Sequence, residues 1–269
     1  MPANASIVAS LEASVSAVTV TPRTGVRFTT VSLSNWRNFG HVDVQLERRV
    51  FLAGPNASGK SNFLDVFRFL HDIAAVGGGF QAAVARRGGV SAIRSLSARR
   101  YPDIEIRVGL GGDDLPESWV YDLAFSQDNQ RRPLIRRERV LLGGRVLLDR
   151  PNAGDEKDPE RLTQTFLEQV NVNQRFRYVA DFFASVRYLH LVPQLVREPD
   201  RSVGRANDPY GGDFLEQVAR TPKPTQGARL RRIAEALRVA VPQLQELELA
   251  RDERGTPHLV IGWSGPSVL

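Results

Sequence analysis

The segment that most limits the fold of this chain is a glycine-rich loop between an apolar run and a helical pattern. Its residues, "GPNASGKS" at 54–61, fit the spacing G-x-x-x-x-G-K-[ST]. In such a loop, backbone N–H groups surround phosphate oxygens, and the N-terminus of the following helix adds partial positive charge. The motif needs a strand before the loop and a helix after it. The sequence therefore predicts a phosphate-binding unit of the α/β class.

The residues on both sides of the loop have the patterns that this unit requires. The apolar run "RVFLAG", 49–54, predicts a short strand that ends at the loop. Upstream, "RFTTVSL" at 27–33 predicts another strand, and "HVDVQL" at 41–46 alternates as a half-buried strand does. A helix is predicted from Ser61 to the glycines at 77–79, because apolar residues recur at helical spacing, namely Phe63, Leu64, Phe67, Leu70, Ile73 and Ala74.

Four residues of the loop have separate roles in binding a nucleotide. Gly54 permits the turn, and Gly59 lets the backbone approach the phosphates. Lys60 reaches the β- and γ-phosphate oxygens, and the Ser61 hydroxyl ligates Mg²⁺. The chain has three lysines and many arginines, so the presence of lysine at position 60 is informative. A compact ammonium fits such a cradle, whereas the planar fork of arginine is too large for it.

Beyond the loop the chain predicts an antiparallel patch and then helices. A helical stretch at 80–97 is followed by strands at 103–110 and 119–126. A hairpin is predicted at 134–150, because Gly143 and Gly144 suit its two-residue turn.

The last part of the chain is predicted to be mostly helical. A helix is expected from Asp158, with Pro159 in its first turn, to about residue 184, either continuous or with a break near residues 171–173. A strand at 186–192, helices at 211–220 and 228–241, and a hairpin at 244–263 with Gly255 near its turn complete the pattern. The order of elements predicts an α/β fold with an inserted or appended β layer.

Composition excludes several classes of protein. The chain has no cysteine, which excludes disulfides and thiolate metal sites. It has no apolar run long enough for a membrane span, and the first residues lack the basic start of a signal peptide, so we expect a cytoplasmic protein. The net charge of +6 makes DNA a candidate partner. Acidic residues are interspersed almost everywhere, so a solvated mixed surface explains the same charge.

Two stretches resemble one family. In the first, "NWRNF" at 35–39 precedes an alternating strand and then "GPNASGKSN", in which Asn56 and Asn62 occupy positions that the generic motif leaves free. This part, 31–70, resembles the N-terminal core of RecF/SMC-like ATPases, the ABC-type branch of the AAA family. A second stretch, 186–218, is loosely similar to uncharacterised bacterial members. The resemblance spans about residues 26–263.

The resemblance implies a fold, a ligand and a set of binding residues. The fold is the N-terminal lobe of an ABC/SMC-type P-loop domain, and the ligand is ATP with Mg²⁺. The triphosphate would be wrapped by Gly54, Asn56, Ala57, Ser58, Gly59, Lys60, Ser61 and Asn62. Arg37 and Asn38 match positions that contact nucleotide, although a surface Arg-Asn turn fits them equally well. Gln194 matches the Q-loop glutamine, although a glutamine after a proline is common in any chain.

This sequence has no convincing match to the residues that hydrolyse ATP in this family. The family uses an apolar strand that ends in Asp-Glu. The run "RVLLD" ends at Asp149 but is followed by Arg150, and Asp181 lies within a helical pattern. The stretch "WSGPS", 263–267, faintly resembles the family's Ser-Gly-Gly-like signature, which contacts the γ-phosphate of the opposite subunit. We therefore expect an incomplete ATPase domain that lacks its C-terminal lobe.

These expectations give a domain plan and two functions. Residues 1–25 are expected to be a weakly ordered extension, followed by a P-loop core at 26–100, a β patch at 101–150 and a helical segment with a hairpin at 151–269. The first function is ATP hydrolysis coupled to dimerisation, in DNA repair or phage defence. The second is a non-hydrolysing nucleotide-binding module, completed by a partner chain or a second ATPase lobe. A GTPase is disfavoured, because the chain has no Asn-Lys-x-Asp motif.

Overall fold

The computed structural model describes residues 25–96, 103–190, 192, 194–195 and 210–263, and the predicted extension at 1–25 lies almost wholly outside these residues. The chain divides into two compact units, Met1–Val186 and Arg187–Leu269. Each unit has its own hydrophobic cluster. The glycine-rich loop belongs to the first unit.

The first unit is built on a six-stranded sheet with the order β2-β1-β3-β4-β5-β6, in which every neighbouring pair is antiparallel. The strands are β1 (Arg27–Trp36), β2 (Phe39–Gln45), β3 (Ile104–Gly111), β4 (Trp119–Gln127), β5 (Pro133–Leu142) and β6 (Arg145–Arg150). The predicted α/β class is thus confirmed, and the strands before residue 50 share one sheet with those after residue 100. Gly143 and Gly144 form the β5–β6 turn as predicted, both at positive φ.

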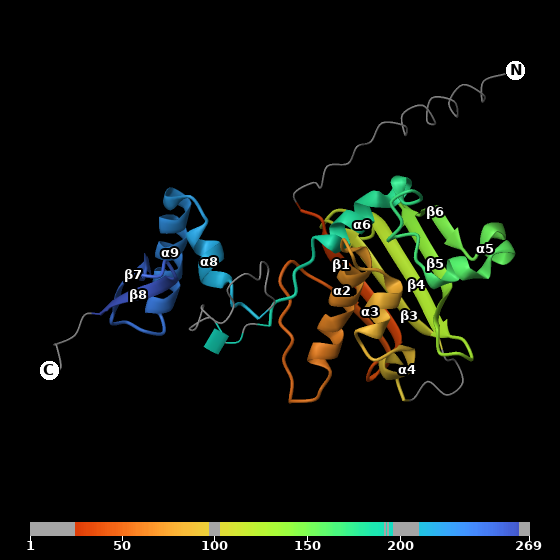
Figure 1. Cartoon of the computed structure of the whole chain (residues 1–269), viewed down its shortest axis with the longest axis horizontal. Coiled ribbons are helices and arrows are strands. Elements are labelled where there is room, and N and C mark those ends of the chain that lie inside the picture. Colours follow the sequence, from red (N-terminus) through yellow and green to blue (C-terminus); the bar gives the residue numbers. More distant parts are fainter. Residues whose placement is uncertain (1–24, 97–102, 191, 193, 196–209, 264–269) are drawn as a thin grey trace, which may run out of the picture. The chain divides into compact units, whose positions relative to one another are not determined.

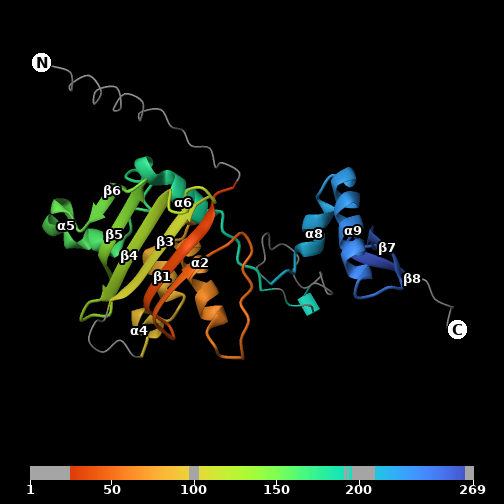
Figure 2. The ribbon, with the colours of Figure 1, turned by 180° about the vertical axis from the view of Figure 1, so that it is seen from behind.

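Helices cover one face of this sheet. They are α2 (Lys60–Ala74), α3 (Phe80–Ala85), α4 (Val90–Ile93) and α6 (Arg177–Ala184). Figure 1 shows α2 and α3 in front of the strands, and Figure 2 shows the sheet from its other side with the helices behind it. Because side chains alternate along a strand, every second residue of a strand faces the helices and supplies the core.

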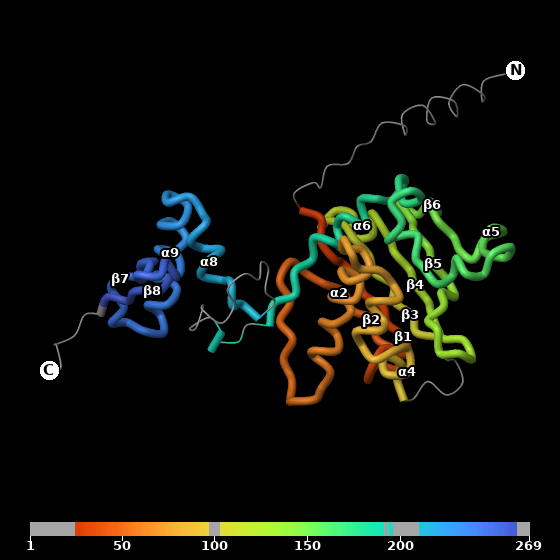
Figure 3. The backbone as a smooth tube through the Cα atoms, viewed as in Figure 1, coloured from red at the N-terminus to blue at the C-terminus, as the bar shows by residue number. Residues whose placement is uncertain are grey.

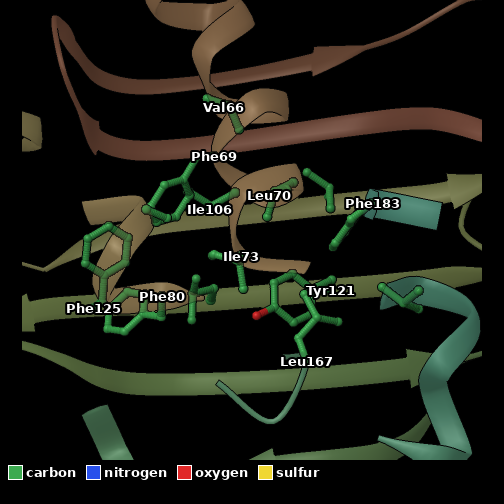
Figure 4. Close-up of a cluster of buried hydrophobic side chains, with 14 of the residues drawn as sticks. Val66, Phe69, Leu70, Ile73, Phe80, Ile106, Tyr121, Phe125, Leu167 and Phe183 are labelled. Carbon is green, nitrogen blue, oxygen red and sulfur yellow. The ribbon is translucent and has the colours of Figure 1, made fainter. Parts of the chain in front are cut away.

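The core lies between α2 and the covered face of the sheet. Across the strands Leu33 lies opposite Ile106, which in turn lies opposite Leu123. Phe69 of α2 is fully buried, and its ring centroid lies 5.6 Å from that of Phe125 on β4. Figure 4 shows Phe69, Ile106 and Phe125 among the side chains that fill the space between the helix and the strands, together with Leu70, Ile73 and Tyr121. The buried face of α2 therefore orients the helix that follows the loop.

A buried ion cluster holds residues 152–167 against β5 and β6. Arg150 is fully buried, and its guanidinium donates to both carboxylate oxygens of Asp155 and to Glu138 Oε2 at 2.9 Å. Burial by itself raises the pKa of Asp155. Hydrogen bonds from Arg150 and from a backbone N–H lower the pKa by more than burial raises it, so the net pKa lies below its usual value. Glu138 also accepts from the backbone N–H groups of Phe166 and Leu167.

This cluster explains why the first part of the helix predicted from Asp158 to residue 184 is wrong, whereas its last part is confirmed as α6 (Arg177–Ala184). The backbone N–H groups near residue 166 bond to a buried carboxylate, so they are not available to a helix. Asp158 is not a side-chain cap within the described chain, and Asn152 instead caps the short helix α5 (Ala153–Lys157). The segment continues through the 3₁₀ turns η1 (Pro159–Thr163) and η2 (Gln174–Phe176) before α6 begins.

The strand predicted at 49–54 is also wrong. Residues 46–59 contain no strand or helix, and Figure 3 shows them as a long open loop in orange. The apolar side chains of this segment are exposed, with Val50 at 45%, Phe51 at 90% and Leu52 at 39%. A short, fully apolar strand normally lies inside a parallel sheet, and among the described residues no strand pairs with this segment. Leu64, predicted on the apolar side of the helix, is also 42% exposed.

The second unit contains helices α8 (Phe214–Ala219) and α9 (Lys223–Arg238) and a hairpin of β7 (Leu244–Arg251) and β8 (Pro257–Trp263). The predicted helices and hairpin are confirmed, and Gly255 takes the positive φ of the turn. Its small core consists mainly of Leu230, Ala234, Leu244 and Leu247. The strand predicted at 186–192 is absent from the described part of that range.

Candidate nucleotide-binding site

The glycine-rich loop lies at the end of the open segment and leads directly into α2. Gly54, Ala57 and Gly59 have positive φ angles of 153°, 64° and 99°. Residues 54–58 are exposed, and α2 starts at Lys60 with Gly59 as its N-cap. Within the described structure no side chain caps this helix and its first turn contains no acidic residue. The first-turn N–H groups and the helix dipole therefore favour an anion at this position.

The side chain of Lys60 lies across its own loop. Its Nζ donates hydrogen bonds to the carbonyl oxygens of Gly54 at 2.8 Å and Pro55 at 2.7 Å. The positive charge is therefore held inside the curve of the loop rather than extended into solvent. Ser61 follows on the first turn of α2 and is exposed. An ammonium and a hydroxyl at these positions are the groups that a nucleotide phosphate and its Mg²⁺ require.

The β1–β2 turn braces the end of the loop. Asn62 donates from Nδ2 to Oδ1 of Asn38 at 2.8 Å, and its carbonyl oxygen accepts from Trp36 Nε1 at 2.8 Å. Asn38 also packs over Gly59, since a Cβ at residue 59 would lie 2.5 Å from Asn38 Nδ2. Glycine at 59 is thus required both by the backbone angle and by this close approach.

Arg37, beside Asn38, is held by the helix that follows the loop. Its guanidinium donates to Asp65 Oδ2 at 3.3 Å and to the carbonyl oxygen of Ala92 at 3.2 Å. Arg87 binds the same Asp65 carboxylate through two closer contacts, at 2.8 and 2.9 Å. A second carboxylate, Asp72, accepts from Arg87 at 2.9 Å. The cluster joins the turn, the loop helix and the end of α3.

Several of the predicted site residues in the first unit lie together. Arg37, Asn38, Gly59 and Asn62 meet at the start of α2, as the contacts above show. Gln194 belongs to the second unit, where it is exposed, and its role in the site stays a prediction.

Sequence reasoning missed Asp65 and Arg87. Asp65 lies four residues after Ser61, the spacing at which two residues share one face of a helix, and this spacing could have identified it. Arg87 lies 22 residues further along and beside Arg86, and nothing in the sequence distinguishes the two arginines.

The two acidic residues that the sequence offered as catalytic candidates lie on β6 and α6. Asp149 lies on β6, four strands from β1 in the sheet, and accepts from Arg139 at 2.8 Å. Asp181 is exposed on α6. The "WSGPS" stretch lies outside the described residues apart from its first residue. In the part of the chain that the structure describes, no group of three His, Asp or Glu side chains could hold a metal ion. The same residues include no helix of the length and apolar character that crossing a membrane requires.

The glycine-rich loop lies within a region of the chain that matches a known protein family. Residues 49–231 match the family described as "AAA domain, putative AbiEii toxin, Type IV TA system". A solved structure, from work on the ATP-driven dimerisation and DNA-stimulated activation of SMC ATPases, is 16% identical. The similarity covers 45% of this chain and 72% of that chain, with a TM-score of 0.30. A search of curated proteins gave no match. Because the family match includes the whole glycine-rich loop and about two thirds of the chain, this chain belongs to the AAA-domain family of nucleotide-binding P-loop ATPases.

Proposed function

We propose that this chain binds ATP with Mg²⁺ at the loop 54–62, and that it works as an ATP-dependent, associating ATPase in DNA repair or phage defence. The observation that carries the proposal is the Lys60 ammonium held inside the loop by Gly54 and Pro55, next to an uncapped helix N-terminus. The phosphates replace the two carbonyl oxygens as partners of Lys60, and the Ser61 hydroxyl ligates Mg²⁺. The family description, which refers to a toxin–antitoxin system, supports the setting in defence.

A titration with fluorescent ATP tests the binding step. Wild-type protein should bind the nucleotide in the presence of MgCl₂, and Lys60→Ala should weaken binding at least tenfold, because the cation that meets the phosphates is lost. Lys157→Ala is the matched control, since Lys157 is the last residue of α5 and lies outside the loop. Equal affinity in wild type and Lys60→Ala would disprove a site at this loop.

A second candidate function is a nucleotide-binding module that is completed by another chain or lobe. The observation that favours it is the exposed apolar row Val50, Phe51 and Leu52 immediately before the loop. A strand supplied from elsewhere would pair with this segment and cover it. The missing catalytic acid would then come with that strand. An ATP turnover assay separates the two functions: the module alone should show negligible turnover, whereas turnover that depends on Lys60 favours the complete ATPase.

The first proposal includes contact with DNA. The open face of the sheet is a poor candidate surface for that contact. Arginines on that face are paired with acids, as in Arg139 with Asp149 at 2.8 Å and Arg137 with Asp122 at 3.0 Å. A face with compensated charges attracts phosphates weakly.

A further inference from the structure

Arg37 is held under strain beside the loop. It occupies the first position of the two-residue β1–β2 turn with a φ of 54°, a conformation that favours glycine. Its backbone N–H donates to the carbonyl oxygen of Ile93 at 2.6 Å, which fixes the turn. Its side chain is less well satisfied. Among the described residues, Arg37 Nε is one of two buried side-chain nitrogens without a hydrogen-bond partner, the other being Arg27 Nε.

The carboxylate of Asp65 accepts hydrogen bonds from both Arg87 and Arg37, but the two sets of contacts are unequal. Arg87 approaches both of its oxygens, at 2.8 and 2.9 Å, in the two-bond geometry that suits guanidinium and carboxylate. Arg37 reaches one of the same oxygens at 3.3 Å. The side chain of Arg87 is 5% exposed and that of Asp65 is 19% exposed, so this pair forms the buried part of the cluster. Arg37 is therefore the weaker of the two partners.

We infer that Arg87 and Asp65 form a positioning pair that keeps Arg37 beside the loop yet free to leave for the phosphates of bound ATP. Because Arg87 satisfies both oxygens of Asp65, departure of Arg37 leaves no buried carboxylate without a cation. Asp65 lies one turn of α2 beyond Ser61, about 6 Å along the helix, so a change of Arg37 rotamer suffices for the transfer. This inference rests on the proposed ATP site and assigns its regulation to two residues outside the loop.

Two substitutions in the pair should act in opposite directions. Arg87→Ala leaves Arg37 as the main partner of Asp65, so ATP has to compete with a buried carboxylate, and the affinity for ATP with MgCl₂ should fall roughly fivefold. Asp65→Asn removes the competing charge, so affinity should be tighter than in the wild type. Arg87 remains paired with Asp72 at 2.9 Å in that variant, which supports its folding. General damage to the fold would weaken binding in both variants.

A double-mutant cycle tests the route through Arg37. ATP affinity is measured by titration for the wild type, Arg37→Ala, Arg87→Ala and the double variant. Arg37→Ala should weaken binding, and adding Arg87→Ala should then have no further effect, because the residue that Arg87 keeps available for ATP is gone. Arg86→Ala is the matched control, since Arg86 contacts Asp72 at 3.3 Å and is 56% exposed.

The results are decisive in each case. The inference is overturned if Arg87→Ala weakens binding by the same factor with and without Arg37, or if Asp65→Asn weakens it as much as Arg37→Ala does. If Arg87→Ala does not fold, Asp65→Asn and Arg37→Ala alone decide between these outcomes. A wild-type protein that fails to bind ATP contradicts the proposed function itself, whereas binding that is insensitive to this pair contradicts only the inference.

Discussion

Gly59 lies where the loop, the β1–β2 turn and α2 meet, and it has two separate reasons to be glycine. Its φ is 99°, and a Cβ would lie 2.5 Å from Asn38 Nδ2 and 3.0 Å from Phe39 Cζ. To make room, Asn38 has to move and lose its hydrogen bond with Asn62. The loop and the turn are therefore joined through a residue that has no side chain.

Substitution at Gly59 should cost more than backbone strain alone. In Gly59→Ala the positive φ costs about 1 kcal/mol of unfolding free energy, and the contact with Asn38 adds roughly 1–3 kcal/mol. Urea unfolding measures the sum. Gly77→Ala is the matched control, because Gly77 has a φ of 73° but nothing within 4 Å of an added Cβ. Equal losses in the two variants would show that Asn38 does not press on Gly59.

At the scale of elements, the segment 50–52 has the composition of a core strand and the exposure of a loop. Phe51→Ser should change the unfolding free energy by less than about 0.5 kcal/mol, because the side chain is 90% exposed. Phe69→Ala on α2 should cost about 3–5 kcal/mol, since Phe69 is fully buried. Urea unfolding of both variants makes the comparison. A loss in Phe51→Ser close to that of Phe69→Ala would show that the segment packs into the core.

Local patterns predicted most of the elements, and contacts between distant residues account for the errors. Alternation identified β2 and β3, and the pair Gly143-Gly144 identified a hairpin turn, because each depends on neighbouring residues. The helix expected directly after Asp158 does not form, because Glu138, some 28 residues before residue 166, binds the backbone N–H groups of Phe166 and Leu167. The loop motif likewise needs only neighbouring residues, and its assignment of Lys60 and Ser61 to the site stays a prediction. Arg87 could not be predicted, since only the fold brings it to Asp65.

The whole molecule consists of two units that differ greatly in the size of their cores. The first unit buries an extensive cluster between its helices and sheet, whereas four residues, with three half-buried neighbours, form the cluster of the second. Because stability follows the apolar surface that is buried, the second unit should unfold at the lower temperature. The loop proposed to bind ATP belongs to the first unit, so a ligand at the loop should stabilise that unit.

The most direct test of the ATP site is therefore calorimetry of the full chain with and without ATP and MgCl₂. The account predicts that ATP raises the transition temperature of the first unit, with a stabilisation of about 2.7 kcal/mol at one hundred times the dissociation constant. It also predicts that Lys60→Ala unfolds at the wild-type temperature without nucleotide and shows no shift with it. The absence of a shift in the wild type, or an equal shift in Lys60→Ala, would contradict the claim that this loop holds the nucleotide.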